Sequence, residues 1–184
     1  MPCLFLSDNL MHNIGQSGLI VRPCSEGDLA MVLHLESIVL AHLDRPDSLR
    51  RNTEEMWHTC LQPPHVCLGA WSGDILVALA VLYIPQEGDA EALAPLLQSI
   101  DTNRHKAANF KICLVHPEWR GNHLQVKLGN LLNSEARQRG FDLLCATASP
   151  HNIASIRSLK QLGYHADHTA QKYGFERIVF FHFN

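Results

Sequence analysis

Short apolar runs recur along the chain and predict the strands of a sheet. Each run is rich in aliphatic or aromatic residues and is bounded by glycine, proline or polar residues, as strands usually are. The predicted strands are 19–22, 66–71, 75–84, 110–115, 143–147, 164–166 and 177–183. The run Ile75–Ile84 is almost wholly apolar, which predicts a central strand that is covered on both faces. Ser72-Gly73-Asp74 is a hairpin signal, so this strand should pair with the one before it.

Between these runs, apolar residues return every three or four positions, which is the period of a helix that buries one face. The helices predicted in this way span about 25–40, 53–62, 122–139 and 149–163. Ser25 followed by Asp28 is a carboxylate variant of the capping box and predicts the first helix start. Ser149-Pro150 predicts an N-cap with proline at the first helical position, and Gly140 predicts a C-terminal cap.

Two segments fall outside this pattern. Residues 1–18 show no clear period and are interpreted as an irregular lead-in to a domain that occupies 19–184. Residues 85–108 are polar at both ends, with a short helix predicted over Ala90–Ile100, and so long an insertion between strands is usually functional or disordered. Since the chain shows neither an internal repeat nor a linker, we expect one α+β layer structure with a mixed sheet.

The stretch Ile112–Gln125 joins a predicted buried strand to a predicted helix through a proline and a short polar loop. Arg120–Gln125 falls where the first backbone N–H groups of that helix have no partner within the helix. Unpaired donors at the positive end of a helix dipole favour an anion. We therefore expect a phosphate-bearing ligand at this loop.

This loop resembles the cofactor loop of the GNAT superfamily of acetyl-CoA-dependent N-acetyltransferases. In that family a Val-x-Pro-like turn leads into an Arg/Gln-x-x-Gly-x-Gly/Ala loop, and here Val115-His116-Pro117 leads into Arg120-Gly121. The stretch Asn152–Tyr164, with its Leu-Gly-Tyr ending, is similar to the family's second signature. The resemblance runs from about Leu19 to the end of the chain. It implies α/β/α layers around a central mixed, mostly antiparallel sheet.

The resemblance also implies an activity and a set of site residues. Acetyl-CoA would be the co-substrate, and a primary amine would attack its thioester directly. The backbone N–H groups of Leu114–His116 would donate to the thioester carbonyl oxygen. The residues that would bind the cofactor are Leu114, Val115, His116, Arg120, Gly121, Asn122, His123, Leu124, Gln125, Asn152 and Ser155.

Three positions depart from the family pattern. His123 and Gln125 replace the small residues of the loop, and Leu159 stands where relatives often carry a tyrosine that protonates the leaving thiolate. Loss of that acid costs about 2 kcal/mol at pH 7 for a thiol of pKa ~8.5, so the thiolate can leave unaided or by way of water. Because 122–125 should form the first helical turn, we expect a negative φ at His123 and an intact diphosphate site. Its imidazolium would either contact a phosphate or turn to solvent.

The attacking amine must be neutral, yet the predicted strand 110–115 has no carboxylate where many relatives place a glutamate. Deprotonation at pH 7 costs about 4.6 kcal/mol for an amine of pKa ~10.4, but only about 1 kcal/mol for an α-amino group. His116 is the candidate base, since an imidazole pKa of ~6.5 suits that role; its alternative is a hydrogen bond to a neighbouring carbonyl. Weaker candidates, each more simply interpreted as a solvated carboxylate, are Glu36, Glu54, Glu55 and Glu87.

Composition and charge indicate the compartment of the protein and exclude some classes of partner. The 184-residue chain has a formal net charge of -3, so it lacks the electrostatic footprint of a protein that binds nucleic acid or an anionic membrane. No apolar run approaches the ~20 residues of a membrane span, and no basic leader precedes Cys3-Leu4-Phe5-Leu6, so we expect a cytoplasmic protein. The six scattered cysteines are expected to be reduced. The twelve histidines lack a ligand motif, so no metal is expected.

The function expected from these features is acetyl transfer from acetyl-CoA to a small-molecule amine or a peptide N-terminus, with a homodimer left open. One alternative is a non-catalytic coenzyme A-binding regulatory module, which the departures at His123, Gln125 and Leu159 favour. Another is a protein-interaction domain that has lost the cofactor site, which the lead-in and the insertion favour. The sequence leaves the acyl acceptor open, and the first two helices and the insertion 85–108 should bind it.

Overall fold

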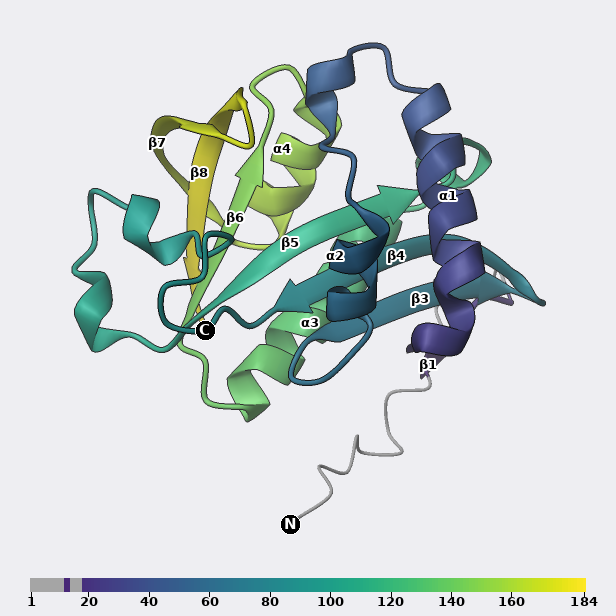
Figure 1. The fold of residues 1–184 in the computed structure, drawn as a ribbon, viewed down its shortest axis with the longest axis horizontal. Coiled ribbons are helices and arrows are strands. Elements are labelled where there is room, and N and C mark those ends of the chain that lie inside the picture. Colours follow the sequence, from purple (N-terminus) through teal and green to yellow (C-terminus); the bar gives the residue numbers. More distant parts are fainter. Residues whose placement is uncertain (1–11, 14–17) are drawn as a thin grey trace.

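A mixed sheet runs through the middle of the computed structural model, which describes residues 12–13 and 18–184 (Figure 1). The strands of this described part follow the order β1-β2-β3-β4-β5-β6-β8-β7. Neighbouring strands are antiparallel except for β5 and β6, which are parallel. The strands are β1 (His12–Asn13), β2 (Ile20–Pro23), β3 (Val66–Ser72), β4 (Ile75–Tyr83), β5 (Ala107–Val115), β6 (Leu143–Ala148), β7 (His165–Lys172) and β8 (Phe175–Phe183).

The helices cover both faces of this sheet, which confirms the predicted α+β fold with α/β/α layers and a mostly antiparallel sheet. They are α1 (Leu29–Ala41), α2 (Glu54–Cys60), α3 (Leu124–Gln138) and α4 (Ile153–Gln161). In Figure 1, α1 and α2 lie in front of the sheet and α3 lies behind it. Among the described residues, no helix is both long enough and apolar enough to cross a membrane.

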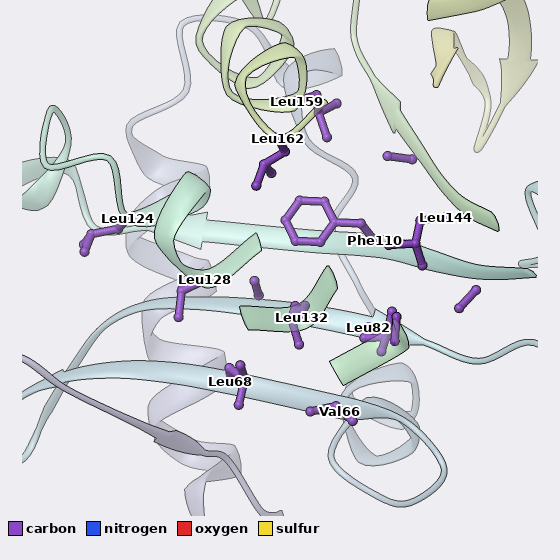
Figure 2. Packing of buried hydrophobic residues seen from close by; sticks show 14 of the residues in the cluster. Val66, Leu68, Leu82, Phe110, Leu124, Leu128, Leu132, Leu144, Leu159 and Leu162 are labelled. Carbon is purple, nitrogen blue, oxygen red and sulfur yellow. The ribbon is translucent and has the colours of Figure 1, made fainter. Parts of the chain in front are cut away.

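The core has one apolar layer on each face of the sheet. On the α3 and α4 side, Leu128 and Leu132 pack with Leu68 and Phe110 from the strands (Figure 2). On the α1 and α2 side, the indole of Trp57 is fully buried among residues of both helices and of the central strands. Every residue of β4 after Ile75 is buried, as the apolar run predicted. The central strands are therefore packed on both faces and form the buried middle layer of the fold.

The helix starts follow their capping signals with one exception. The reciprocal bonds of the Ser25 and Asp28 capping box are present, and Thr53 Oγ1 accepts a hydrogen bond from the Met56 amide at 3.1 Å. The predicted start of the last helix at Ser149-Pro150 is wrong. The Ser149 hydroxyl accepts a bond from the amide two residues on, and this closes a turn before the helix. Asn152 is the N-cap of α4.

The insertion before β5 is ordered, and the helix predicted over 90–100 is wrong. The segment contains only the short 3₁₀ turns Ala94–Leu96 and Thr102–Arg104. Pro95 offers a physical reason, because proline has no N–H group for the helical hydrogen bond and obstructs the preceding turn. The segment is fixed by Asp167 of β7, whose carboxylate accepts the amides of Gln98 at 2.9 Å and Ser99 at 3.2 Å.

The N-terminal lead-in lies largely outside the described residues. Within it, His12–Asn13 form β1 and pair with Val21 and Ile20 of β2. At the other end of the sheet, β7 and β8 form the predicted terminal hairpin. Its turn residues Tyr173 and Gly174 both have positive φ, at 60° and 79°.

Candidate active site

A cavity of about 610 Å³ lies where β5 and β6 separate. These parallel strands pair only at Ala107–Asn109 and Leu143–Cys145. Beyond that ladder, 110–115 of β5 and 146–148 of β6 contribute residues to the cavity lining. The other walls come from the segment after α1, the loop before α3, the start of α4 and the β7–β8 hairpin. The separation of two strands thus opens a site between segments that are distant in the sequence.

The loop before α3 forms one end of the cavity. Gly121 has φ +82°, and His123 lies in the left-handed region with φ 56° and ψ 26°. The expected negative φ at His123 is therefore wrong, because α3 begins only at Leu124 and His123 is its N-cap. The left-handed residue turns the chain from the loop into the helix axis. For an L-residue with a β-carbon, this conformation costs roughly 1–2 kcal/mol.

The start of α3 offers unpaired donors. Its first helical hydrogen bond runs from the Lys127 amide to the His123 carbonyl at 3.0 Å. The amides of Leu124, Gln125 and Val126 precede that bond, and within the described residues they donate to no backbone acceptor. Leu124 and Gln125 line the cavity together with the exposed Arg120. This arrangement can bind an anion through backbone donors, the helix dipole and a guanidinium.

The end of β5 offers a donor of a different kind. The His116 amide donates to the Val77 carbonyl of β4 at 2.9 Å, so it is not free. Ladder hydrogen bonds in an antiparallel pair alternate, which commits the Leu114 amide to β4 and turns the Val115 amide towards the cavity side. Of the three backbone amides expected to donate to the thioester carbonyl oxygen, only that of Val115 is left without a partner in β4.

The His116 side chain is not among the residues that line the cavity. Its Nδ1 accepts a hydrogen bond from the Glu118 amide at 3.3 Å and caps the 3₁₀ turn Pro117–Trp119. This bond also rules out the expected alternative partner, a carbonyl, for that nitrogen. The geometry favours a capping role for His116 over base catalysis.

The structure gathers most of the predicted cofactor residues on the cavity wall. Those that line it are Val115, Arg120, Gly121, His123, Leu124, Gln125, Asn152 and Ser155. Leu114 is fully buried in the core on the α1 side, and Asn122 Nδ2 donates to the Trp119 carbonyl at 3.0 Å. Gln125 Nε2 donates to Ser155 Oγ at 3.3 Å, which joins the starts of α3 and α4.

Asn152 both caps the start of α4 and lines the cavity. Its Oδ1 accepts the Ser155 amide at 3.0 Å, while its Nδ2 donates to no described residue. Leu159, at the position of the family's tyrosine, is 1% exposed and belongs to the core (Figure 2). That position therefore provides no proton donor.

The four glutamates considered as weaker base candidates lie outside the cavity lining. Glu36 is the informative one, because it is buried rather than solvated. Its Oε1 accepts both the amide and the side-chain Nδ2 of Asn52, at 3.0 and 2.8 Å, and its Oε2 accepts Trp57 Nε1 at 2.9 Å. Glu36 thus anchors the segment before α2 to α1. Glu54, Glu55 and Glu87 are exposed.

An ion cluster that sequence reasoning missed lies beside the cavity. Lys111 of β5 has a side chain only 3% exposed and pairs with Glu91 of the insertion. Arg50 Nη1 bonds the same carboxylate at 2.8 Å, and its guanidinium lies 4.5 Å from the Tyr173 ring centroid. Burial alone would raise the pKa of Glu91, but the two cations outweigh it and lower that pKa. Its charge is thus already paired. A lysine inside an apolar strand was the available sequence signal, since lysine is rarely buried without a partner.

Cys113 also lines the cavity, but it is a poor nucleophile. Burial raises the pKa of its thiol to about 12, so the thiolate is scarce near neutral pH. The five cysteines in the described part of the chain, Cys24, Cys60, Cys67, Cys113 and Cys145, are all free. Cys3 lies outside the described residues. The arrangement favours attack by an external nucleophile over a covalent enzyme intermediate.

Comparison with known families agrees with this geometry. The model of the Acetyltransferase (GNAT) family matches residues 36–164, most of the chain. The chain belongs to the GNAT acetyltransferase family. It is therefore an acyltransferase of a family that uses acetyl-CoA. No curated protein matches the chain.

Solved structures show the same GNAT fold at low sequence identity. The putative acetyltransferase yncA of Salmonella typhimurium, solved with its cofactor acetyl-CoA, is 19% identical with a TM-score of 0.66, covering 90% of this chain and 93% of its own. The ribosomal-protein-S18-alanine N-acetyltransferase of Escherichia coli is 16% identical with a TM-score of 0.67, covering 90% and 93%. The ribosomal-protein-alanine N-acetyltransferase of Brucella melitensis is 20% identical with a TM-score of 0.65, covering 89% and 99%.

Proposed function

We propose that this GNAT acetyltransferase transfers an acetyl group from acetyl-CoA to a primary amine by direct attack on the thioester. The observation that carries the proposal is the cavity between β5 and β6. It places the unpaired amides at the start of α3, the Arg120 guanidinium and the Val115 amide around one space. The acceptor is a small-molecule amine or a peptide N-terminus. The free cysteines support the cytoplasm as the compartment.

The start of α3 is suited to the diphosphate of coenzyme A. The amides of Leu124, Gln125 and Val126 supply donors, and Arg120 supplies positive charge beside them. Asn152 and Ser155 on α4 face the same space, so they suit the pantetheine or diphosphate arm. The amides are fixed by the backbone of α3, which lowers the entropy lost on binding.

The Val115 amide is suited to the carbonyl oxygen of the thioester. As the amine nitrogen bonds to the carbonyl carbon, negative charge develops on that oxygen and strengthens the hydrogen bond from a fixed donor. The C–S bond then breaks, the thiolate leaves, and the amine gives up its proton to water. Holding the two reactants in one cavity supplies the rest of the acceleration through orientation.

Titration with acetyl-CoA and a screen of acceptors test this proposal. We expect the protein to bind acetyl-CoA in isothermal titration, and Arg120→Gln to weaken binding about tenfold or more through loss of a charge-assisted contact. Arg104→Gln is the matched control, because the Arg104 side chain is 84% exposed and lies on the insertion. Thiol release is then measured with amino acids, polyamines and peptides.

The three functional hypotheses give different outcomes in this pair of measurements. Binding with turnover supports the acetyltransferase. Binding without turnover of any amine would contradict it in favour of a coenzyme A-binding regulatory module. Absence of binding would favour a protein-interaction domain that has lost the cofactor site.

A further inference from the structure

Arg177 is a buried cation on the cavity wall. It lies far along the chain from the loop before α3. The residue lies on β8, is 4% exposed and lines the cavity with its neighbour Tyr173. Its Nε is buried and has no hydrogen-bond partner. Its Nη1 makes a single long contact, 3.5 Å from the Ser48 carbonyl. Within the described residues, no carboxylate forms a salt bridge with this guanidinium.

The neighbouring cations already have partners, so Arg177 alone is left over. Arg45 Nε bonds Asp47 at 3.1 Å, and Arg50 and Lys111 share the carboxylate of Glu91. The charge of Asp47 favours the Arg177 cation at longer range, but burial dominates and lowers the pKa of Arg177. Among these four cations, Arg177 is therefore the one whose guanidinium has no carboxylate partner within the described residues.

A buried guanidinium without a partner destabilises the folded state, because it has lost its hydrating water without gaining an anion. Its Nε and Nη2 form one edge of a planar fork, and that edge donates to no described residue. Two parallel N–H groups of this kind match the two oxygens of a carboxylate. The single charge of this guanidinium is balanced by one carboxylate. The missing partner thus has a defined chemistry.

We propose that the acceptor amine carries a carboxylate and that Arg177 binds that carboxylate. The inference rests on the proposed function, and it specifies the acceptor class of the same cavity. The acceptors that fit are amino acids and short peptides with a free C-terminal carboxylate. With the carboxylate at β8, the amine is directed across the cavity towards β5 and the thioester.

Matched acceptors with and without the carboxylate test this inference. We measure kcat/KM for glycine against glycinamide, and for glycylglycine against glycylglycinamide, with the parent, Arg177→Met and the control Arg137→Met. Arg137 is exposed in the last turn of α3 and does not line the cavity. The quantity compared is the carboxylate-to-amide ratio in the variant relative to the parent, because differences in amine pKa cancel in it. For at least one pair, Arg177→Met should lower that ratio by about tenfold or more, whereas Arg137→Met should leave it unchanged.

The failures of the two proposals are distinguishable. Acetylation of amines with the same ratio in the parent and in Arg177→Met overturns the carboxylate site and leaves the acetyltransferase standing. Absence of turnover with every amine overturns both.

Thermal unfolding without ligand provides the folding control. A purely structural arginine would lose stability on substitution. An unpaired buried cation should not, so Arg177→Met should melt at the same temperature as the parent or higher. A clear fall in melting temperature together with an unchanged acceptor ratio would assign Arg177 to the scaffold and contradict the proposal.

Discussion

His123 maintains a left-handed backbone conformation with a side chain that glycine would lack. The position lies directly before α3, where the chain turns so that the amides of the first helical turn face the cavity. The conformation depends on the backbone, whereas a phosphate contact depends on the imidazole. Two substitutions separate these effects, because glycine and alanine both remove the imidazole and only glycine relieves the backbone.

We expect the free energy of unfolding of His123→Gly to be about 1 kcal/mol higher than that of His123→Ala, as measured by urea denaturation. If the imidazolium contacts a phosphate, the parent should bind acetyl-CoA more tightly at about pH 5.5 than at about pH 8, and both variants should lose that difference. If binding is undetectable in the parent and restored in His123→Gly, the diphosphate site is broken in this chain.

Asn152 combines a helix cap with an amide group on the cavity wall. Asn152→Ala should weaken use of acetyl-CoA more than Ser158→Ala does, although both side chains line the cavity. It should also destabilise the fold by about 1 kcal/mol through the lost cap. Asn152→Ser is the matched control, since serine keeps a cap acceptor but has no amide donor. If Asn152→Ala keeps the parental affinity for acetyl-CoA in isothermal titration, Asn152 does not contact the cofactor.

At the scale of elements, β7 fixes the insertion before β5 beside the cavity, although none of the insertion's residues lines it. Asp167 accepts hydrogen bonds from Gln98 and Ser99, and the Lys172 ammonium donates to the Ala90 carbonyl at 2.6 Å. These bonds lie next to Glu91, whose carboxylate pairs with both Lys111 and Arg50 beside the cavity. Loosening the insertion should therefore expose two unpaired cations.

Asp167→Asn should destabilise the protein at neutral pH, and the difference from the parent should disappear in acid. Burial alone would raise the pKa of Asp167, but donors from Ser99, the Gln98 amide and His168 outweigh it and lower the pKa to about 2. A carboxylate whose pKa is lower in the folded state stabilises above its unfolded pKa of ~3.9 and loses this effect as pH falls towards the folded value. Urea unfolding between about pH 2 and 7 measures it.

The exposed Asp74 in the β3–β4 turn provides the control for this experiment. Asp74→Asn should stay within about 0.5 kcal/mol of the parent over the same range. A loss of stability in Asp167→Asn that persists unchanged below about pH 2 would show that packing, not the carboxylate charge, connects the insertion to β7.

At the scale of the whole molecule, several cationic side chains line the cavity but few carboxylates do. The imidazoles of His42, His123 and His151 also line it. Asp44 is the only carboxylate among its described lining residues, and it is exposed. The glutamates proposed from the sequence lie elsewhere, and His116 caps a turn. Because the cavity has no buried carboxylate among its described lining residues, we expect the fraction of acceptor amine that is already neutral to limit the rate.

We expect activity to follow the pKa of the acceptor amine. With a lysine side chain or a polyamine, kcat/KM should rise about tenfold per pH unit from pH 7 to 9, whereas an α-amino group should level off near its pKa of ~7.7–8.0. Steady-state thiol release over that range measures both profiles. Fast acetylation of lysine or polyamines at pH 7, with no rise towards pH 9, would reveal a base within the protein.

The sequence by itself determined most of the elements and the helix start at which we propose that the cofactor binds. Apolar runs gave the central strands, and side chains such as Thr53 capped helices at the predicted residues. The free amides at the start of α3 were also predictable, because they depend only on where that helix begins. These features are decided by neighbours in the chain, so local patterns suffice. The local exceptions were the φ of His123, the start of α4 at Asn152 instead of Ser149, and the helix expected over 90–100. The φ of His123 depended on where α3 begins, which is Leu124.

Only the tertiary structure decided which residues form the wall that we propose for the acceptor, and which partners the charged residues have. Glu91 meets Arg50 from 41 residues away, and Arg177 meets Ser48 from 129 residues away. Glu36 is buried because it bonds Asn52 and Trp57 of a different segment, although its own helix pattern fits a solvated carboxylate equally well. The charge, burial and partner of such a side chain are set by which distant segments fold against it. No local pattern encodes that choice, because the energy of a buried charge depends on its surroundings.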